Sequence, residues 1–184
     1  MPIVLTHFAS PTTTAYWYPA WMMAWVAFNV PISVGLVQFN DIVKHPGQAR
    51  SVVRQGVMWS LMLGGVVSLV AAAAADPLLS VLGDGYADAS VTALRVLLLG
   101  LLPFTVLQAY NALCRGAGRT GEAIALGLGL MAAVAVGTAL VGERGPTAVA
   151  VLWLSVSSAA ALWALWRLRV AMRVMRLLEE PAHD

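Results

Sequence analysis

Five long apolar runs, separated by short polar segments, constrain the fold of this chain more than any other feature. A helix that crosses a hydrocarbon core of about 30 Å needs about 20 apolar residues, because it rises about 1.5 Å per residue. Five segments have that length, and we predict a membrane-spanning helix for each: residues 17–39, 56–75, 91–113, 122–141 and 147–166. The sequence therefore predicts an all-α, polytopic membrane helix bundle.

The composition excludes several other classes of protein. Charged residues make up 11% of the 184 residues, whereas a soluble domain carries about 25%. The excess positive charge lies beside apolar spans and not on a polar domain, so we expect no nucleic-acid partner. A single cysteine, Cys114, excludes an internal disulfide and a cysteine-based metal cluster. The three histidines lack ligand spacing, and no convergent acid, base or nucleophile set is visible, so we expect no metal, no cofactor, no catalytic residues and no enzymatic activity.

The basic residues predict how the spans are oriented. Nine of the eleven fall into three segments: Lys44, Arg50 and Arg54; Arg115 and Arg119; and Arg167, Arg169, Arg173 and Arg176. Residues 76–90 hold three aspartates, and Arg95 is the first basic residue after them. Because cytoplasmic loops carry excess Lys and Arg, we predict a multi-pass protein of the plasma (inner) membrane, with the N-terminus outside and residues 167–184 as a basic cytoplasmic tail.

Aromatic and small residues predict how the helices sit and pack. Tyr16, Trp17, Tyr18 and Trp21 gather at the outer end of the first span, where we expect the rings at the headgroup level. Small residues recur at every fourth position in two spans, as Gly64, Ser68 and Ala72 and as Gly129, Ala133 and Gly137. Such spacing lets helices approach closely, and we expect about half of these faces to be interfaces. Pro31 and Pro103 each remove a backbone donor and are expected to kink their helices.

Three motifs, taken in order, resemble a known family. The stretch from Ser10-Pro11 to Trp21 opens a helix that carries Pro31 and Ser33. Residues 82–87, Leu-Gly-Asp-Gly-Tyr-Ala, resemble a Phe-Gly-x-x-Tyr-Ala pattern, and Asn111, Arg115, Gly118 and Thr120 resemble an Asn-x-x-x-Arg-x-x-Gly-x-x loop. Together they resemble the polysaccharide-export flippases of the MOP superfamily, the Wzx-like O-antigen and exopolysaccharide flippases.

The resemblance implies a fold and a function. The family has two lobes around a central cavity and moves a polyprenyl-diphosphate-linked sugar by alternating access. The five spans, with residues 1–8 as the tail of a truncated sixth helix, would form the C-terminal lobe. The implied partners are the lipid bilayer, the lipid-linked sugar, and a missing N-terminal lobe or its separate polypeptide. Two alternatives stay open: a multidrug/cation antiporter of the same superfamily, and a non-transporting membrane subunit of a cell-envelope synthase.

Polar side chains within the spans are the candidate site residues. The substrate-cavity candidates are Arg95, Gln108, Tyr110, Asn111, Asn29 and Gln38. Arg95 lies about one turn inside its span, where it would contact either a cavity or the outer headgroups. Gln108, Tyr110 and Asn111 would line the cytoplasmic mouth of a cavity or hydrogen-bond a neighbouring helix. Asn29, beside Pro31, would repair the helix or contact substrate, and Gln38, at the inner end of the same span, is a cavity candidate. Arg167, Arg169, Arg173 and Arg176 are predicted to contact anionic lipid headgroups.

Overall fold

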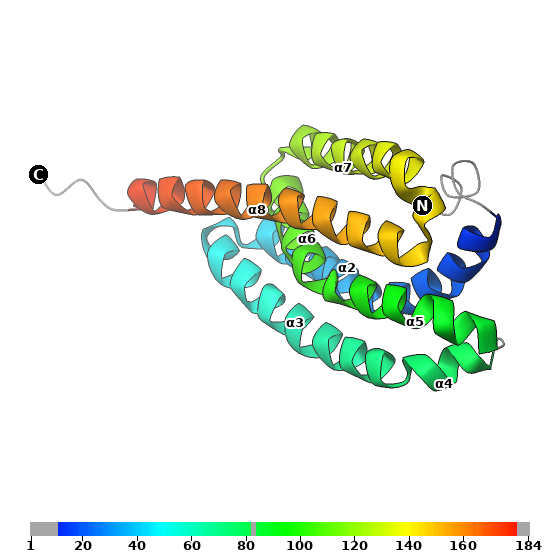
Figure 1. The fold of residues 1–184 in the computed structure, drawn as a ribbon. Coiled ribbons are helices and arrows are strands. Elements are labelled where there is room, and N and C mark those ends of the chain that lie inside the picture. The colour runs from blue at the N-terminus through cyan, green and yellow to red at the C-terminus, as the bar shows by residue number, and fades with distance from the viewer. Residues whose placement is uncertain (1–10, 82–83, 180–184) are drawn as a thin grey trace, which may run out of the picture.

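The computed structural model describes residues 11–81 and 84–179, and within them the side chains of residues 12, 84–89 and 171–179 are not described. The expected helix tail at residues 1–8 lies outside this part of the chain. The described residues form helices and no strand: α2 (Pro11–Lys44), η1 (Pro46–Gln48), α3 (Ala49–Ala73), α4 (Ala75–Ser80), α5 (Asp84–Leu99), α6 (Leu101–Gly116), α7 (Thr120–Val141), η2 (Gly142–Arg144) and α8 (Pro146–Glu179). The predicted all-α bundle is confirmed (Figure 1).

Four of these helices are long and apolar enough to cross a membrane, namely α2, α3, α7 and α8. The bent pair α5 and α6 makes a fifth span if it is counted as one. Both α2 and α8 contain 34 residues, so each is about 50 Å long and exceeds the hydrocarbon core. The basic segment from Arg167 is a continuation of α8 and not a separate tail, and the end of this helix projects past the bundle in Figure 1.

The bend between α5 and α6 measures 40° and falls at Gly100. Pro103 is the third residue of α6, and its missing N–H cannot bond the carbonyl of Leu99. The ring of Trp153 packs into the bend, so close that a Cβ added to Gly100 would lie 2.0 Å from it. Pro103 therefore acts with a glycine to break the span. By contrast, α2 continues as one helix through Pro19 and Pro31.

Aromatic rings from α2, α6 and α8 form the core at the end of the bundle where α2 begins, and Phe104 is the ring from α6. Trp21 stacks on Trp17 at 5.7 Å and meets Trp153 of α8 edge-on at 5.8 Å, both measured between ring centroids. Phe28 stacks on Trp153 at 5.1 Å. Trp17 is fully buried and Trp21 nearly so, so both rings pack against other helices, and their position at the headgroup level stays a prediction. Residues of α5 and α8 cover this side of α2 and turn the rings into core.

A second core cluster joins α2, α3, α6 and α8 farther along the bundle, and it includes Ile42, Val53, Leu113 and Leu168. Helix α7 packs against α8 and one end of α6, and it lies at the edge of the bundle (Figure 1). It is also the least buried of the four long apolar helices. Tyr110 of α6, Glu122 of α7 and Arg167 of α8 therefore lie where a peripheral helix meets the packed helices.

Candidate functional site

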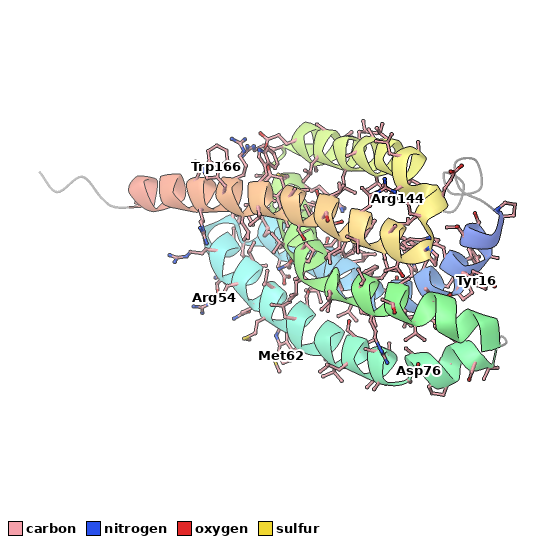
Figure 2. The ribbon with its side chains drawn as sticks, in the orientation of Figure 1. Tyr16, Arg54, Met62, Asp76, Arg144 and Trp166 are labelled. Atoms are coloured by element: carbon pink, nitrogen blue, oxygen red, sulfur yellow. The ribbon has the colours of Figure 1, made fainter. Side chains whose placement is uncertain are left out.

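The three basic segments come together at one end of the bundle, which we call the basic end. The turn from α2 to α3 carries Lys44 and Arg50, the turn from α6 to α7 carries Arg115 and Arg119, and α8 passes beside both with Arg167. Asp76 and Tyr16 lie at the opposite end (Figure 2). The helices alternate in direction between these ends, as the predicted membrane topology requires.

A single carboxylate organises the polar side chains of the basic end. Glu122, in the first turn of α7, accepts a hydrogen bond from the hydroxyl of Tyr110 on α6 at 2.8 Å. Arg167 on α8 donates to the other carboxylate oxygen at 2.9 Å. Arg119, in the turn before α7, donates to that same oxygen. We call these four residues the Glu122 network, and they tie three helices together.

The surroundings of the network are partly aromatic and partly open to solvent. Tyr110 is buried, and its ring meets that of Trp163 edge-on at 5.6 Å between centroids. The guanidinium carbon of Arg167 lies 5.8 Å from the Trp163 ring centroid, within the range of a cation–π contact. The Glu122 carboxylate raises the pKa of the Arg119 guanidinium through their hydrogen bond. Two arginines and one carboxylate leave one net positive charge.

An apolar groove runs from the Glu122 network along the interface of α7 and α8. Its volume is about 530 Å³. Ala125, Gly129 and Ala133 line it from α7, and Val156 and Ala160 line it from α8. Trp163, Arg167 and Glu122 stand at its polar end. The groove therefore combines a charged end at the basic end of the bundle with an apolar length inside the predicted membrane.

The structure does not gather the predicted cavity residues into one site. Arg95 lies far from the Glu122 network and forms an ion pair with Asp76 of α4 at 2.8 Å. Both side chains are more than half exposed. Asn29 is exposed and donates to the Trp25 carbonyl. The carbonyl freed by Pro31 belongs to Ala27. Asn29 was expected to satisfy that carbonyl but donates to Trp25 instead.

Gln38 and Gln108 lie at contacts of α2 with other helices. The amide of Gln38 is buried and donates to the carbonyl of Val53 at 3.1 Å, which joins α2 to α3. A Cβ added to Gly56 would lie 1.9 Å from this amide, so the glycine makes room for it. Gln108 on α6 lies against Gly35 of α2. Gln38 therefore joins two helices, a role that the sequence did not predict for it.

Residues 43–128 match the family model of MatE. This match supports the MOP superfamily. No curated protein and no solved structure gives a match. MatE proteins are membrane transporters and not enzymes, and the match agrees with the absence of an enzymatic role expected from the sequence. The coarse prediction, a multi-pass membrane protein with a transport function of the MOP superfamily, is supported.

The stretch that matches MatE includes the loop motif of residues 111–120, one of the three motifs on which the resemblance rests. Arg115 places its guanidinium 4.7 Å from the ring centroid of Phe39 on α2. Gly118 has a φ of 72°, a left-handed conformation that glycine adopts without steric cost. Thr120 begins α7. The side-chain oxygen Oδ1 of Asn111 is buried and has no hydrogen-bond partner among the described residues. The motif thus fixes the turn that delivers Glu122 to Tyr110.

Sequence reasoning missed Glu122 and Arg119 as site residues, and for Arg167 it predicted a contact with lipid headgroups but not the bond to Glu122. An acid in the first turn of a helix is already explained by its favourable interaction with the helix dipole, so its presence there does not indicate a site. Arg119 and Glu122 are three apart, a spacing at which side chains meet on a helix, and that was the available signal. Arg169 is exposed, as a headgroup contact requires, whereas the side chains of Arg173 and Arg176 lie outside the described part.

Proposed function

We propose that this chain is one lobe of an alternating-access transporter that moves a polyprenyl-diphosphate-linked oligosaccharide across the plasma membrane. The MatE match supports the superfamily, and the order of the three motifs favours the flippase branch. In this proposal the lobe works with a second lobe, and the polar cavity lies between them. The predicted topology puts the basic end, with its arginines, in the cytoplasm, on the side from which the substrate would be moved.

The position of the carboxylates favours a flippase over an antiporter. Within the described spans, the acidic residues Asp41, Glu122 and Glu143 lie in terminal turns and none lies in the middle of a span. A cation-coupled antiporter needs an acid that binds and releases a cation inside the membrane. Glu122, the acid with the most contacts, is already bound by two arginines. Arginines, in contrast, suit a diphosphate because each can donate two parallel hydrogen bonds.

Reconstitution tests this proposal. The chain is placed in vesicles alone and together with a candidate N-terminal lobe, and movement of a fluorescently labelled lipid-linked oligosaccharide is followed with a membrane-impermeant quencher. We expect movement when both lobes are present. If folded protein with both lobes moves the label no faster than empty vesicles, the flippase proposal is wrong.

Two further measurements address the alternatives. Export of a cationic dye driven by an imposed sodium or proton gradient, without movement of the labelled sugar lipid, would favour the antiporter. Purification of the chain in a stable complex with a glycosyltransferase, without a second lobe, would favour a non-transporting subunit.

A further inference from the structure

The groove between α7 and α8 lies at the edge of the bundle, and the proposed transport mechanism assigns no role to it. We propose that it holds one acyl chain of an anionic membrane phospholipid, whose phosphate binds Arg167 and Arg119. This proposal requires that the chain spans a membrane, and it does not depend on which substrate is transported.

Small residues on α7 create the groove. Gly129 and Ala133 line it, and a Cβ added to Gly129 would meet nothing within 4 Å. Two turns farther along, a Cβ added to Gly137 would lie 2.5 Å from Leu152 of α8. The two helices therefore touch near Gly137 and leave space between them toward the basic end. Nothing in the described part of the chain fills that space.

The length of the groove matches one leaflet of a bilayer. The groove extends along α7 from Glu122 to Ala133, and eleven residues of helix rise about 16 Å. The hydrocarbon core is about 30 Å thick, so the groove covers about half of it. Its walls are apolar except at the end where Glu122 and Arg167 stand. This shape fits a single chain that enters from the leaflet at the basic end.

The charge at the open end selects an anionic headgroup. The side chains of Arg119 and Arg167 are 43% and 32% exposed, and a guanidinium has five N–H donors, so each keeps donors beyond its bond to Glu122. The pair exceeds the single carboxylate by one positive charge. Trp163 borders the same end of the groove, and the predicted topology puts this end near the membrane interface, where indole rings are enriched. A lipid with a net negative headgroup satisfies these groups better than a zwitterionic lipid.

Lipid retention measures this directly. The full chain is equilibrated in detergent micelles that contain equal amounts of phosphatidylglycerol and phosphatidylcholine with the same acyl chains, and the bound lipid is counted by native mass spectrometry. We expect wild-type protein to retain phosphatidylglycerol about fivefold over phosphatidylcholine, as one additional favourable arginine contact implies. Arg167→Gln should remove this preference.

A leucine in the groove tests the site of the acyl chain. A Cβ at position 129 meets no neighbouring atom within 4 Å, so Gly129→Leu should fold without a clash. The variant should lower the retained phosphatidylglycerol about tenfold, because the new side chain occupies the place of the lipid. Gly127→Leu is the matched control, since its Cβ also meets nothing within 4 Å but the residue does not line the groove. Ala133→Leu repeats the block if Gly129→Leu does not fold.

Three outcomes would overturn the proposal. The first is equal retention of both lipids by wild-type protein, and the second is equal retention of phosphatidylglycerol by wild-type protein and the groove variants. The third is displacement of phosphatidylglycerol from wild-type protein by an equal amount of polyprenyl phosphate, which would assign the groove to the transported lipid. Failure of the flippase assay would leave all three measurements unchanged.

Discussion

Glu122 shows how much a single residue can hold together in this bundle. Its two carboxylate oxygens accept hydrogen bonds from Tyr110, Arg119 and Arg167. These partners come from α6, from the turn before α7 and from α8, so one side chain connects the peripheral helix to the packed helices. Neutralisation of the carboxylate would weaken the hydrogen bonds that it accepts from a buried hydroxyl and from two guanidinium groups.

Tyr110→Phe should lower the free energy of unfolding by about 1 kcal/mol, because it removes one hydrogen bond to a charged acceptor and keeps the ring. Glu122→Gln should lower the midpoint of unfolding further, since it weakens both arginine contacts as well. Unfolding of the purified protein in mixed detergent micelles measures both effects. The double variant should lose less than the sum of the single losses, because the two residues share a contact. Strict additivity would contradict the network.

Arg95 allows stability to be separated from transport. Its ion pair with Asp76 is exposed, and exposed pairs contribute about 0–1 kcal/mol. Arg95→Gln should therefore leave the unfolding midpoint almost unchanged. If Arg95 contacts the substrate, the same variant should slow movement of the lipid-linked sugar in the reconstituted two-lobe system. A stable variant with full transport would remove Arg95 from the list of cavity residues.

At the scale of elements, the broken span is the most particular feature. Gly100 permits the approach of the Trp153 ring at the bend between α5 and α6, where Pro103 withholds a hydrogen bond. The bend also brings Leu97 and Leu101 into the core cluster around Trp153. The bend at Gly100 and Pro103 thus determines how α8 packs on the rest of the bundle.

Gly100→Ala should destabilise the protein by about 1–3 kcal/mol, the usual cost of adding a methyl group to a packed core. The bulky ring of Trp153 cannot move far, because Phe28 stacks on it at 5.1 Å. Gly127→Ala provides the control, since its Cβ enters open space and alanine favours a helix. Chemical unfolding of both variants should give changes of opposite sign. Equal stability of the Gly100 variant and wild type would refute the tight contact.

The sequence was sufficient for the all-α bundle of long apolar helices, because apolar length alone indicates a helix that can cross a membrane. It was insufficient to predict which side chains of different helices contact one another. The burial of Trp17 and Trp21 could not be predicted, since the covering residues of α5 and α8 are distant in sequence. Asp76 is nineteen residues from Arg95. The repeat of small residues predicted interfaces correctly at Gly64 and Gly137, but at Gly129 it marks a groove.

For the whole molecule, the gathering of basic segments at one end leads to a test of orientation. The predicted topology places the turn at Gly47 in the cytoplasm and the turn at Arg144 outside. In a Cys114→Ala background, a cysteine at Arg144 should react with a membrane-impermeant thiol reagent in intact cells, and one at Gly47 should react only after permeabilisation. Both positions are exposed, so access to the reagent decides the result. The reverse pattern would invert the topology.

The peripheral position of α7 has a consequence for biosynthesis. This helix is the most apolar of the four long spans and the least buried, so it is stable in lipid before it contacts its neighbours. The bent α5–α6 pair, with its interrupted hydrogen bonds, depends on surrounding helices from the start. We therefore expect α2 to α6 to assemble first as the chain leaves the ribosome, and α7 to dock last, when Glu122 meets Tyr110 and Arg167. Glu122→Gln should then delay protease resistance of newly made protein without reducing its membrane insertion.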